Sequence, residues 1–209
     1  MTISLDSLRQ CLAKQSRPEE SGILESIVRI VMDEAPLEFI EGFTTEEICS
    51  TAQEILATLR EATKESPRIK VSNPPYKTGR KLSEFTLLEV CLPDRPFLLD
   101  SIKFGLKRIG AGINSYIHPV FDLSLGPGGK IKEILLQRVG EGQSFSYELF
   151  LLSRIDDDGH LAEIEKTVRR ILGDVIRATE DYEAMRRKCM ETAERIRSMA
   201  RLLSPDSLP

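Results

Sequence analysis

The sequence contains no long hydrophobic run, no excess of positive charge and no closely spaced cysteines. No segment approaches the roughly 18 apolar residues of a membrane span, and Asp6 and Arg9 interrupt the start of the chain, so we expect neither a membrane helix nor a signal peptide. The 29 basic and 33 acidic side chains leave a net charge of −4, which argues against general nucleic-acid binding because that needs a basic surface. The expected compartment is the cytoplasm.

Patterns that carry catalysis or metal binding are also missing. The dinucleotide-binding, HExxH and GxSxG motifs do not occur, and the glycine-rich segment 126–129 lacks the lysine and hydroxyl residue of a phosphate-binding loop. The acidic run 156–159 fails the EF-hand pattern because its sixth position is Leu161 rather than glycine, and we expect it to cap a helix. The four cysteines, which we expect to be reduced and structural, are Cys11, Cys49, Cys91 and Cys189. We therefore predict no catalytic residue and no metal site in this chain.

The 209 residues suffice for one domain, or two small ones, with a hydrophobic core. In residues 1–66 the apolar side chains recur every three or four positions, which predicts helices. Thr44 and Glu47 have the spacing of a capping box, in which each side chain bonds the backbone N–H of the other residue at the start of a helix.

The middle of the chain changes to a pattern of short apolar segments separated by turns, which predicts strands. The expected strands span 69–71, 85–92, 113–125, 130–139 and 145–151. A helix is expected from Pro96 to Ile109, with Gly105 marking close packing on its apolar face, and another from Leu161 to Ile176. This order predicts an α+β fold with a ferredoxin-like antiparallel sheet and packing helices, in which strand 69–71 is available as a further strand.

The loop between the strand 85–92 and the helix at Pro96 is the main candidate for a binding site. Free backbone N–H groups at a helix start can receive a carboxylate, and Asp94 and Asp100 can accept an ammonium group. The alternative is structural: Asp94 only caps the helix and Asp100 faces solvent. His118 can act as an acid, a base or a ligand, or serve as a hydrogen-bonded structural residue. If it faces the loop, it can contact Asp100.

The segment 92–99 resembles the first strand, loop and helix of ACT domains, which are ferredoxin-like regulatory modules that often bind amino acids. Those domains commonly have a glycine after the proline, where this chain has Phe97. A closer resemblance is to the N-terminal region of the large bacterial NAD-specific glutamate dehydrogenases, which have similar segments in the same order. The matching segments are 68–74, 94–101 and 117–120, and the similarity extends from Glu46 to Arg186.

The resemblance implies a non-catalytic regulatory or assembly module. It implies an ACT-like α+β domain at 67–180 between an N-terminal helical segment, 1–66, and a C-terminal helical extension, 181–209. The parent enzyme oxidatively deaminates glutamate to 2-oxoglutarate with NAD, but its catalytic domain lies far downstream, so no cofactor is expected in this chain. The implied effector-binding residues are Asp94, Arg95, Phe97, Asp100, Ser101 and His118.

Several interpretations stay open at this point. The chain is either an excised N-terminal piece of such an enzyme or a free-standing relative. It is a stand-alone amino-acid sensor if it binds a small molecule by itself, and a structural module if it only self-associates or docks to a dehydrogenase core. An independent enzyme is a further alternative. The expected partners are accordingly an amino-acid effector, a second copy of the chain or a dehydrogenase core.

Overall fold

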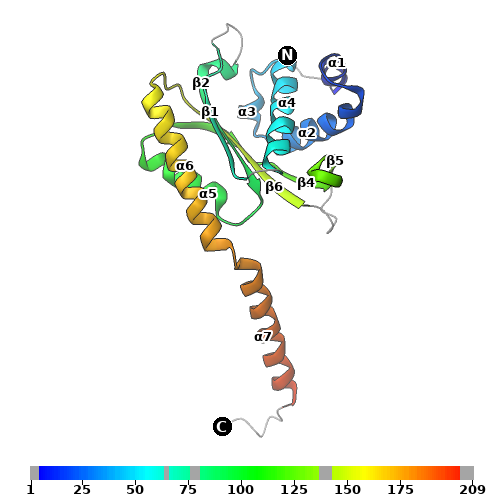
Figure 1. The fold of residues 1–209 in the computed structure, drawn as a ribbon, viewed down its shortest axis with the longest axis vertical. Helices are drawn as coiled ribbons and strands as arrows, with labels where there is room; N and C mark the ends of the chain where they lie inside the picture. The colour runs from blue at the N-terminus through cyan, green and yellow to red at the C-terminus, as the bar shows by residue number, and fades with distance from the viewer. Residues whose placement is uncertain (1–4, 64–65, 76–80, 137–142, 203–209) are drawn as a thin grey trace. The chain divides into compact units, whose positions relative to one another are not determined.

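A computed structural model describes residues 5–63, 66–75, 81–136 and 143–202 (Figure 1). The helices are α1 (Leu5–Gln15), α2 (Ser21–Glu34), α3 (Leu37–Ile40), α4 (Thr45–Ala62), α5 (Leu98–Arg108), α6 (Asp158–Thr179) and α7 (Tyr182–Leu202). The strands are β1 (Arg68–Ser72), β2 (Phe85–Pro93), β3 (Ile113–Ile117), β4 (Val120–Leu125), β5 (Ile131–Leu135) and β6 (Gln143–Ser153). Residues up to Leu172 form one compact unit, and those from Gly173 onward form a second.

The start of α4 confirms the predicted capping box. The backbone N–H of Glu47 donates to Thr44 Oγ1 at 3.1 Å, and the backbone N–H of Thr44 donates to Glu47 Oε2 at 2.9 Å. The second oxygen of the Glu47 carboxylate accepts the backbone N–H of Leu82 at 3.2 Å. A local helix-start signal therefore also fixes a segment 35 residues further along the chain.

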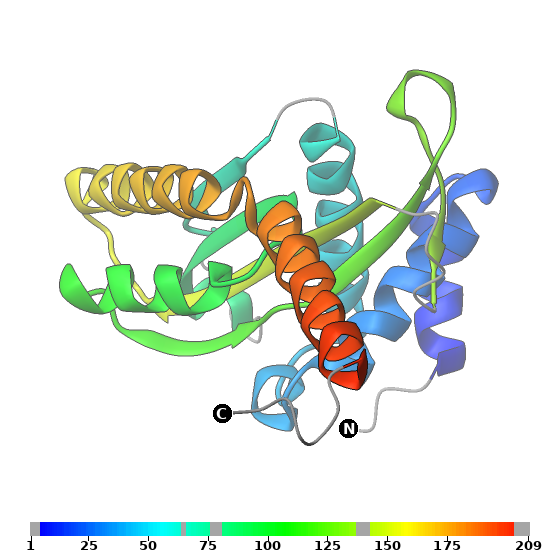
Figure 2. The ribbon, with the colours of Figure 1, turned by 90° about the horizontal axis from the view of Figure 1, so that it is seen from below.

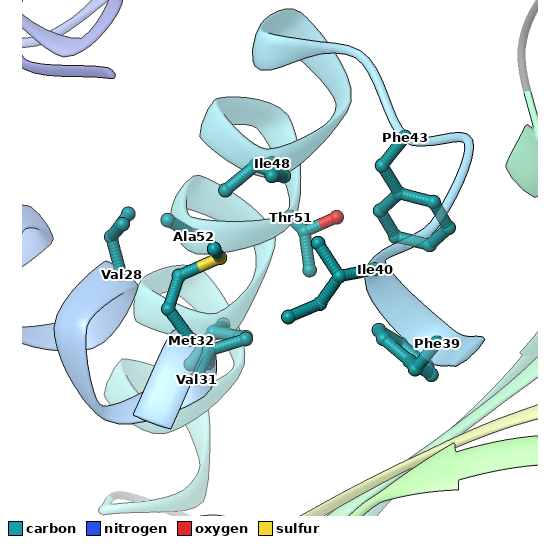
Figure 3. Close-up of a pocket in the computed structure, with 10 residues that line it drawn as sticks. Val28, Val31, Met32, Phe39, Ile40, Phe43, Ile48, Thr51 and Ala52 are labelled. Atoms are coloured by element: carbon teal, nitrogen blue, oxygen red, sulfur yellow. The ribbon is translucent and has the colours of Figure 1, made fainter. Parts of the chain in front are cut away.

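Helices α2, α3 and α4 enclose a small apolar cavity (Figure 3). Val28 and Met32 of α2 face Ile48 and Ala52 of α4, and Phe43 closes one side. Its volume is about 20 Å³, close to the space of one water molecule. Because its walls are almost wholly apolar, this space is a packing defect of the helical core rather than a ligand site.

The sheet is antiparallel, with the strand order β1-β2-β6-β4-β5. Strand β3 also pairs with β6, so β3 and β4 lie one after the other along the same edge of β6. Residues His118 and Pro119 separate them, since Ile117 is opposite Leu149 and Val120 is opposite Ser146. The predicted α+β fold is confirmed, and the segment around 69–71 supplies the further strand, β1, beside β2.

Both faces of the sheet are covered by helices (Figures 1 and 2). On β6 the odd-numbered side chains from Phe145 to Leu151 belong to the core shared with α1, α2 and α4. The even-numbered side chains, such as Phe150, point to the opposite face and are equally buried. The apolar residues buried on α5 and on the first part of α6 are Leu98, Ile102, Leu106, Ile164, Val168 and Leu172. The central strands are therefore buried on both sides.

The second unit contains α7, whose side chains are almost all exposed. Its apolar residues Met185, Met190, Ile196 and Met199 are 54–64% exposed. Exposed apolar side chains gathered on one helix make it a candidate contact surface.

We expect Gly105→Ala to destabilise the protein. A Cβ atom at position 105 of α5 would lie 2.0 Å from Cδ1 of Ile171 on α6, so the two helices would have to separate or Ile171 would have to leave its rotamer. Overpacking of this kind costs about 1–3 kcal/mol, which exceeds the gain of about 1 kcal/mol in helix propensity. Urea unfolding measures the difference.

The matched control is Gly22→Ala in α2, where an added Cβ meets nothing within 4 Å. This variant is expected to keep or slightly raise the free energy of unfolding. The double variant Gly105→Ala with Ile171→Val, which removes the clashing Cδ1, should recover most of the loss. Equal free energies of unfolding for wild type and Gly105→Ala would contradict the close helix crossing.

Candidate functional site

The loop between β2 and α5 differs from the prediction in where the helix begins. Pro96 is not the first helical residue, because Pro96 and Phe97 form a turn and α5 begins at Leu98. The residue that caps α5 is Phe97, without a side-chain hydrogen bond to the first turn. One oxygen of the Asp94 side chain accepts a hydrogen bond from the sheet, since Ser146 Oγ donates to Asp94 Oδ1.

Phe97 has a left-handed backbone, with φ of +70°. This conformation costs a non-glycine residue roughly 1–2 kcal/mol and is uncommon for a bulky side chain. The aromatic ring gains little from burial in return, since Phe97 is 63% exposed. ACT domains commonly have glycine at this position, and Phe97 adopts the backbone conformation that glycine favours. Local strain of this kind is typical of functional loops.

Four polar side chains meet where this loop leaves the sheet. Asp94 lies at the end of β2, Ser146 and Glu148 on β6, and His118 in the gap between β3 and β4. Ser146 Oγ donates to Asp94 Oδ1 at 2.7 Å. His118 Nε2 lies 3.2 Å from Ser146 Oγ and 3.4 Å from Glu148 Oε1. We call these four residues the Asp94 cluster.

The hydrogen bonds of the Asp94 cluster define where its protons lie. The single hydroxyl hydrogen of Ser146 is given to Asp94, so the contact between Ser146 and His118 requires an N–H on His118 Nε2. This hydrogen points into the protein, toward Ser146 and Glu148. A polar chain therefore runs from the partly exposed ring of His118, through Ser146, to the carboxylate of Asp94.

Glu148 is the most unusual member of the Asp94 cluster. Its side chain is fully buried, and neither carboxyl oxygen makes a hydrogen bond to any residue in the described part of the chain. Burial, and secondly the negative charge of Asp94, raises the pKa of Glu148 to about 8. Burial also lowers the pKa of His118, an effect that Asp94 partly opposes. Near neutral pH the Glu148 carboxyl and the His118 ring are therefore uncharged.

The structure places the other predicted site residues on the outer surface of the loop and helix start. The Nε–H of Arg95 donates to the carbonyl of Pro93 at 3.5 Å. Asp100 is exposed in the first turn of α5, and the backbone N–H of Ser101 donates to the carbonyl of Phe97. Among the described residues no polar contact joins Asp100 to His118, so the expected contact between them is replaced by the contacts of His118 with β6.

Sequence reasoning missed Ser146 and Glu148. In strand 145–151 the residues alternate, which predicts one apolar face and one mixed face that carries Ser146 and Glu148. A signal was present, because Phe150 and Leu152 continue the same face and are buried. A charged residue among large apolar neighbours on a strand is a candidate for burial and for an unusual pKa.

The remaining sequence motifs have structural roles. The carboxylate of Asp157 accepts the backbone N–H of His160 at 2.8 Å, which confirms that the acidic run caps a helix. The four cysteines are unpaired, and burial raises the pKa of the Cys49 thiol to about 12. Across the described ranges, no group of three or more His, Cys, Asp and Glu is placed to hold a metal ion. No helix there is long and apolar enough to cross a membrane.

Replacing Glu148 with glutamine is expected to change how stability depends on pH. In the unfolded chain this carboxyl titrates near 4.5, and in the native protein near 8. Between these values the native state holds a proton that the unfolded state has lost, so wild-type stability falls as pH rises, by up to about 1.4 kcal/mol per pH unit. Glu148→Gln lacks this decrease, and its advantage over wild type should grow from pH 5 to pH 8 in urea unfolding.

The matched control for this experiment is Glu133→Gln, which changes an exposed glutamate on β5. Its unfolding free energy should follow the wild-type curve at every pH. Parallel curves for wild type and Glu148→Gln would show that Glu148 is not protonated in the native state.

Comparisons with known proteins agree with the resemblance seen in the sequence. The family model "Glutamate dehydrogenase, ACT1 domain" matches residues 27–168. Three relatives carry the name NAD-specific glutamate dehydrogenase. The protein from Pseudomonas aeruginosa is 33% identical over 131 residues, 61% of this chain and 8% of its own length. The protein from Halomonas elongata is 22% identical over 199 residues, 92% of this chain and 12% of its own length.

The third relative, from Mycobacterium tuberculosis, is 30% identical over 125 residues, 57% of this chain and 8% of its own length. No solved structure matches the chain. The chain therefore spans about a tenth of the length of these relatives. Since the family model matches residues 27–168, which is more than half of the chain, the chain belongs to the glutamate dehydrogenase ACT1 domain family.

Proposed function

We propose that this chain is a non-catalytic regulatory module of an NAD-specific glutamate dehydrogenase and that it binds a small amino compound at the Asp94 cluster. The match to about a tenth of the dehydrogenases supports the idea that the oxidative deamination of glutamate to 2-oxoglutarate takes place on other residues of a longer protein. The four unpaired cysteines favour a cytoplasmic location.

The observation that carries the proposal is the buried carboxyl of Glu148, without a hydrogen bond, beside Asp94 and His118. A buried polar group without a hydrogen bond is costly and calls for a functional explanation. The ligand's ammonium group would lie at Asp94, where it would also reduce the cost of ionising Glu148. Its carboxylate would be received by the free N–H groups in the first turn of α5, which has no side-chain cap.

A ligand at this place can regulate only if it binds one state of the protein better than another. The β2–α5 loop is suited to such a role because its strained Phe97 and its polar contacts to β6 both depend on the loop conformation. Ordering this loop would stabilise the connection between the sheet and α5.

Thermal unfolding against a panel of amino acids and NAD tests this proposal. A ligand at about a hundred times its Kd stabilises the native state by about 2.7 kcal/mol, which raises the Tm of a chain of this size by several degrees. We expect a selective rise with one amino acid, lost in Asp94→Asn, because the ammonium group loses its charged partner. No shift is expected with NAD.

The matched control is Asp100→Asn, which removes the same charge from an exposed position in the first turn of α5. It should keep the ligand-induced rise in Tm. A flat panel, or a rise that survives Asp94→Asn, would refute an amino-acid site at the Asp94 cluster.

A second candidate function, assembly, is favoured by α7. The residues Tyr182, Met185, Cys189, Thr192, Ile196 and Met199 follow one another at alternating spacings of three and four. This is the heptad spacing of a helix that packs against another helix. We call these six residues the α7 seam. Among the described residues of α7, the seam includes the exposed Met185, Ile196 and Met199, and the exposed Met190 lies outside it.

The charges beside the α7 seam favour a partner other than a second copy. Within α7 the charged residues at the positions flanking the seam are Arg186, Lys188 and Arg195, all basic, whereas Asp181 just before the helix is acidic. In a parallel pair of identical helices, Lys188 and Arg195 face alanine, and Arg186 faces Asp181, which precedes the helix. In an antiparallel pair the basic residues face one another. A helix with an apolar seam flanked by glutamate or aspartate is the complementary partner, and we propose that the longer protein supplies it.

Two synthetic heptad peptides with the same Leu/Ile seam distinguish the partners of α7. One carries glutamate at the flanking positions and the other carries lysine. Fluorescence anisotropy should show that the chain binds the glutamate peptide at least tenfold more tightly, and that Ile196→Glu removes this binding. Equal binding of both peptides, or self-association of the chain that Ile196→Glu abolishes in sedimentation, would contradict an acidic partner.

A further inference from the structure

A second space for a small molecule lies on the sheet face opposite the Asp94 cluster. It is bounded by α4 and by β1, β2 and β6, and its volume is about 570 Å³. Cavities that hold small molecules in proteins span roughly 300–1,000 Å³. We call it the α4 cavity.

More acidic than basic side chains line the α4 cavity. Glu47 and Glu54 of α4 and Glu89 of β2 supply three carboxylates, whereas Lys70 of β1 supplies one ammonium group. Glu47 is occupied by the capping box and by Leu82. Lys70 Nζ lies 3.0 Å from Glu54 Oε2 and 3.3 Å from Glu89 Oε1. Among the described residues that line the cavity, Glu54 and Glu89 carry one more charge than Lys70 neutralises, which favours a cation.

Glu89 forms the buried end of this charged group. Its side chain is about 5% exposed, and its second oxygen accepts the hydroxyl of Tyr147 at 2.8 Å. The side chains of Lys70 and Glu54 are 51% and 58% exposed. The long side chain of Lys70 can therefore reach solvent, whereas the Glu89 carboxylate stays buried. A buried carboxylate left without its cation is costly, so Lys70 can leave readily only when another cation takes its place.

The rest of the α4 cavity is apolar on one side. Leu87 and Leu149 belong to the sheet face below the helix layer, and Pro74 and Leu82 line the cavity from the segments that follow β1 and precede β2. An apolar wall beside a pair of carboxylates matches a molecule that has a cationic head and an apolar body.

We propose that the α4 cavity binds a small organic cation, whose ammonium or guanidinium group lies between Glu54 and Glu89 in place of Lys70 and whose apolar body packs on Leu87 and Leu149. This site is separate from the Asp94 cluster and does not depend on the proposed regulatory function. The ammonium of Lys70 holds the carboxylates together when the ligand is absent. The ligand and Lys70 then compete for the same pair of carboxylates.

Methyl NMR of the full chain tests the proposal with hexylamine as the probe. Saturable shifts are expected at the methyl groups of Leu87 and Leu149, and no shifts at Leu88 and Leu152, which point to the opposite sheet face. The matched probes are hexanoate, which is an anion, and hexanol, which is uncharged, and both have an apolar chain of similar length. Equal shifts with these probes, or no shift with hexylamine, would overturn the proposal.

Variants separate charge recognition from simple filling of an apolar space. Lys70→Met removes the internal competitor and should tighten hexylamine binding by about tenfold, whereas Glu54→Gln should weaken it by a similar factor. Glu54 is exposed, so this variant is expected to fold even where Glu89→Gln does not. Hexylamine affinity that falls in Lys70→Met, or that is unchanged in Glu54→Gln, would show that the cation does not replace Lys70.

Discussion

The pairing of β2 with β6 is the interaction on which the rest of the structure depends. These strands form the centre of the sheet and pair in one continuous register from Phe85 opposite Ser153 to Pro93 opposite Phe145. Because both faces of the pair are buried, the chain needs two helical layers. Helices α5 and α6 cover one face, as in a ferredoxin-like domain, and the helices that precede the sheet cover the other. The N-terminal helices are thus part of the core and not an appendage to it.

Burial on both faces also explains why two carboxyl groups of the central strands behave so differently. Glu89 and Glu148 lie on adjacent strands and point to opposite faces. Glu89 has the hydroxyl of Tyr147 and the ammonium of Lys70 as partners. Among the described residues, His118 lies 3.4 Å from Glu148 and no hydrogen bond reaches its carboxyl oxygens, so burial raises the pKa of Glu148 to about 8. One face therefore holds a compensated charge, and the other holds a carboxyl whose charge depends on what lies near Asp94.

The sequence predicted the features that depend on neighbouring residues and missed those that depend on distant pairing. The capping box of Thr44 and the close packing at Gly105 are local patterns, and both are confirmed. The predicted start of α5 was two residues too early, because no sequence pattern indicates the left-handed backbone of Phe97. The partner of His118 was missed because Ser146 is 28 residues away, and the strand register that joins them appears only in the folded sheet.

The spacing of apolar residues in α7 continues the spacing found in α6. In α6 the apolar residues Ile164 and Val168 are buried, and the three–four spacing to which they belong continues in register through Met185 and Ile196 of α7. A helix of this kind gains most of its stability from packing of its apolar face, so α7 with its exposed seam is marginal by itself. Binding of a complementary helix would therefore bury the seam and fix α7 in one step. In the assembly proposed above, the basic residues beside the seam would disfavour a second copy of the chain, and binding of the acidic partner would order α7.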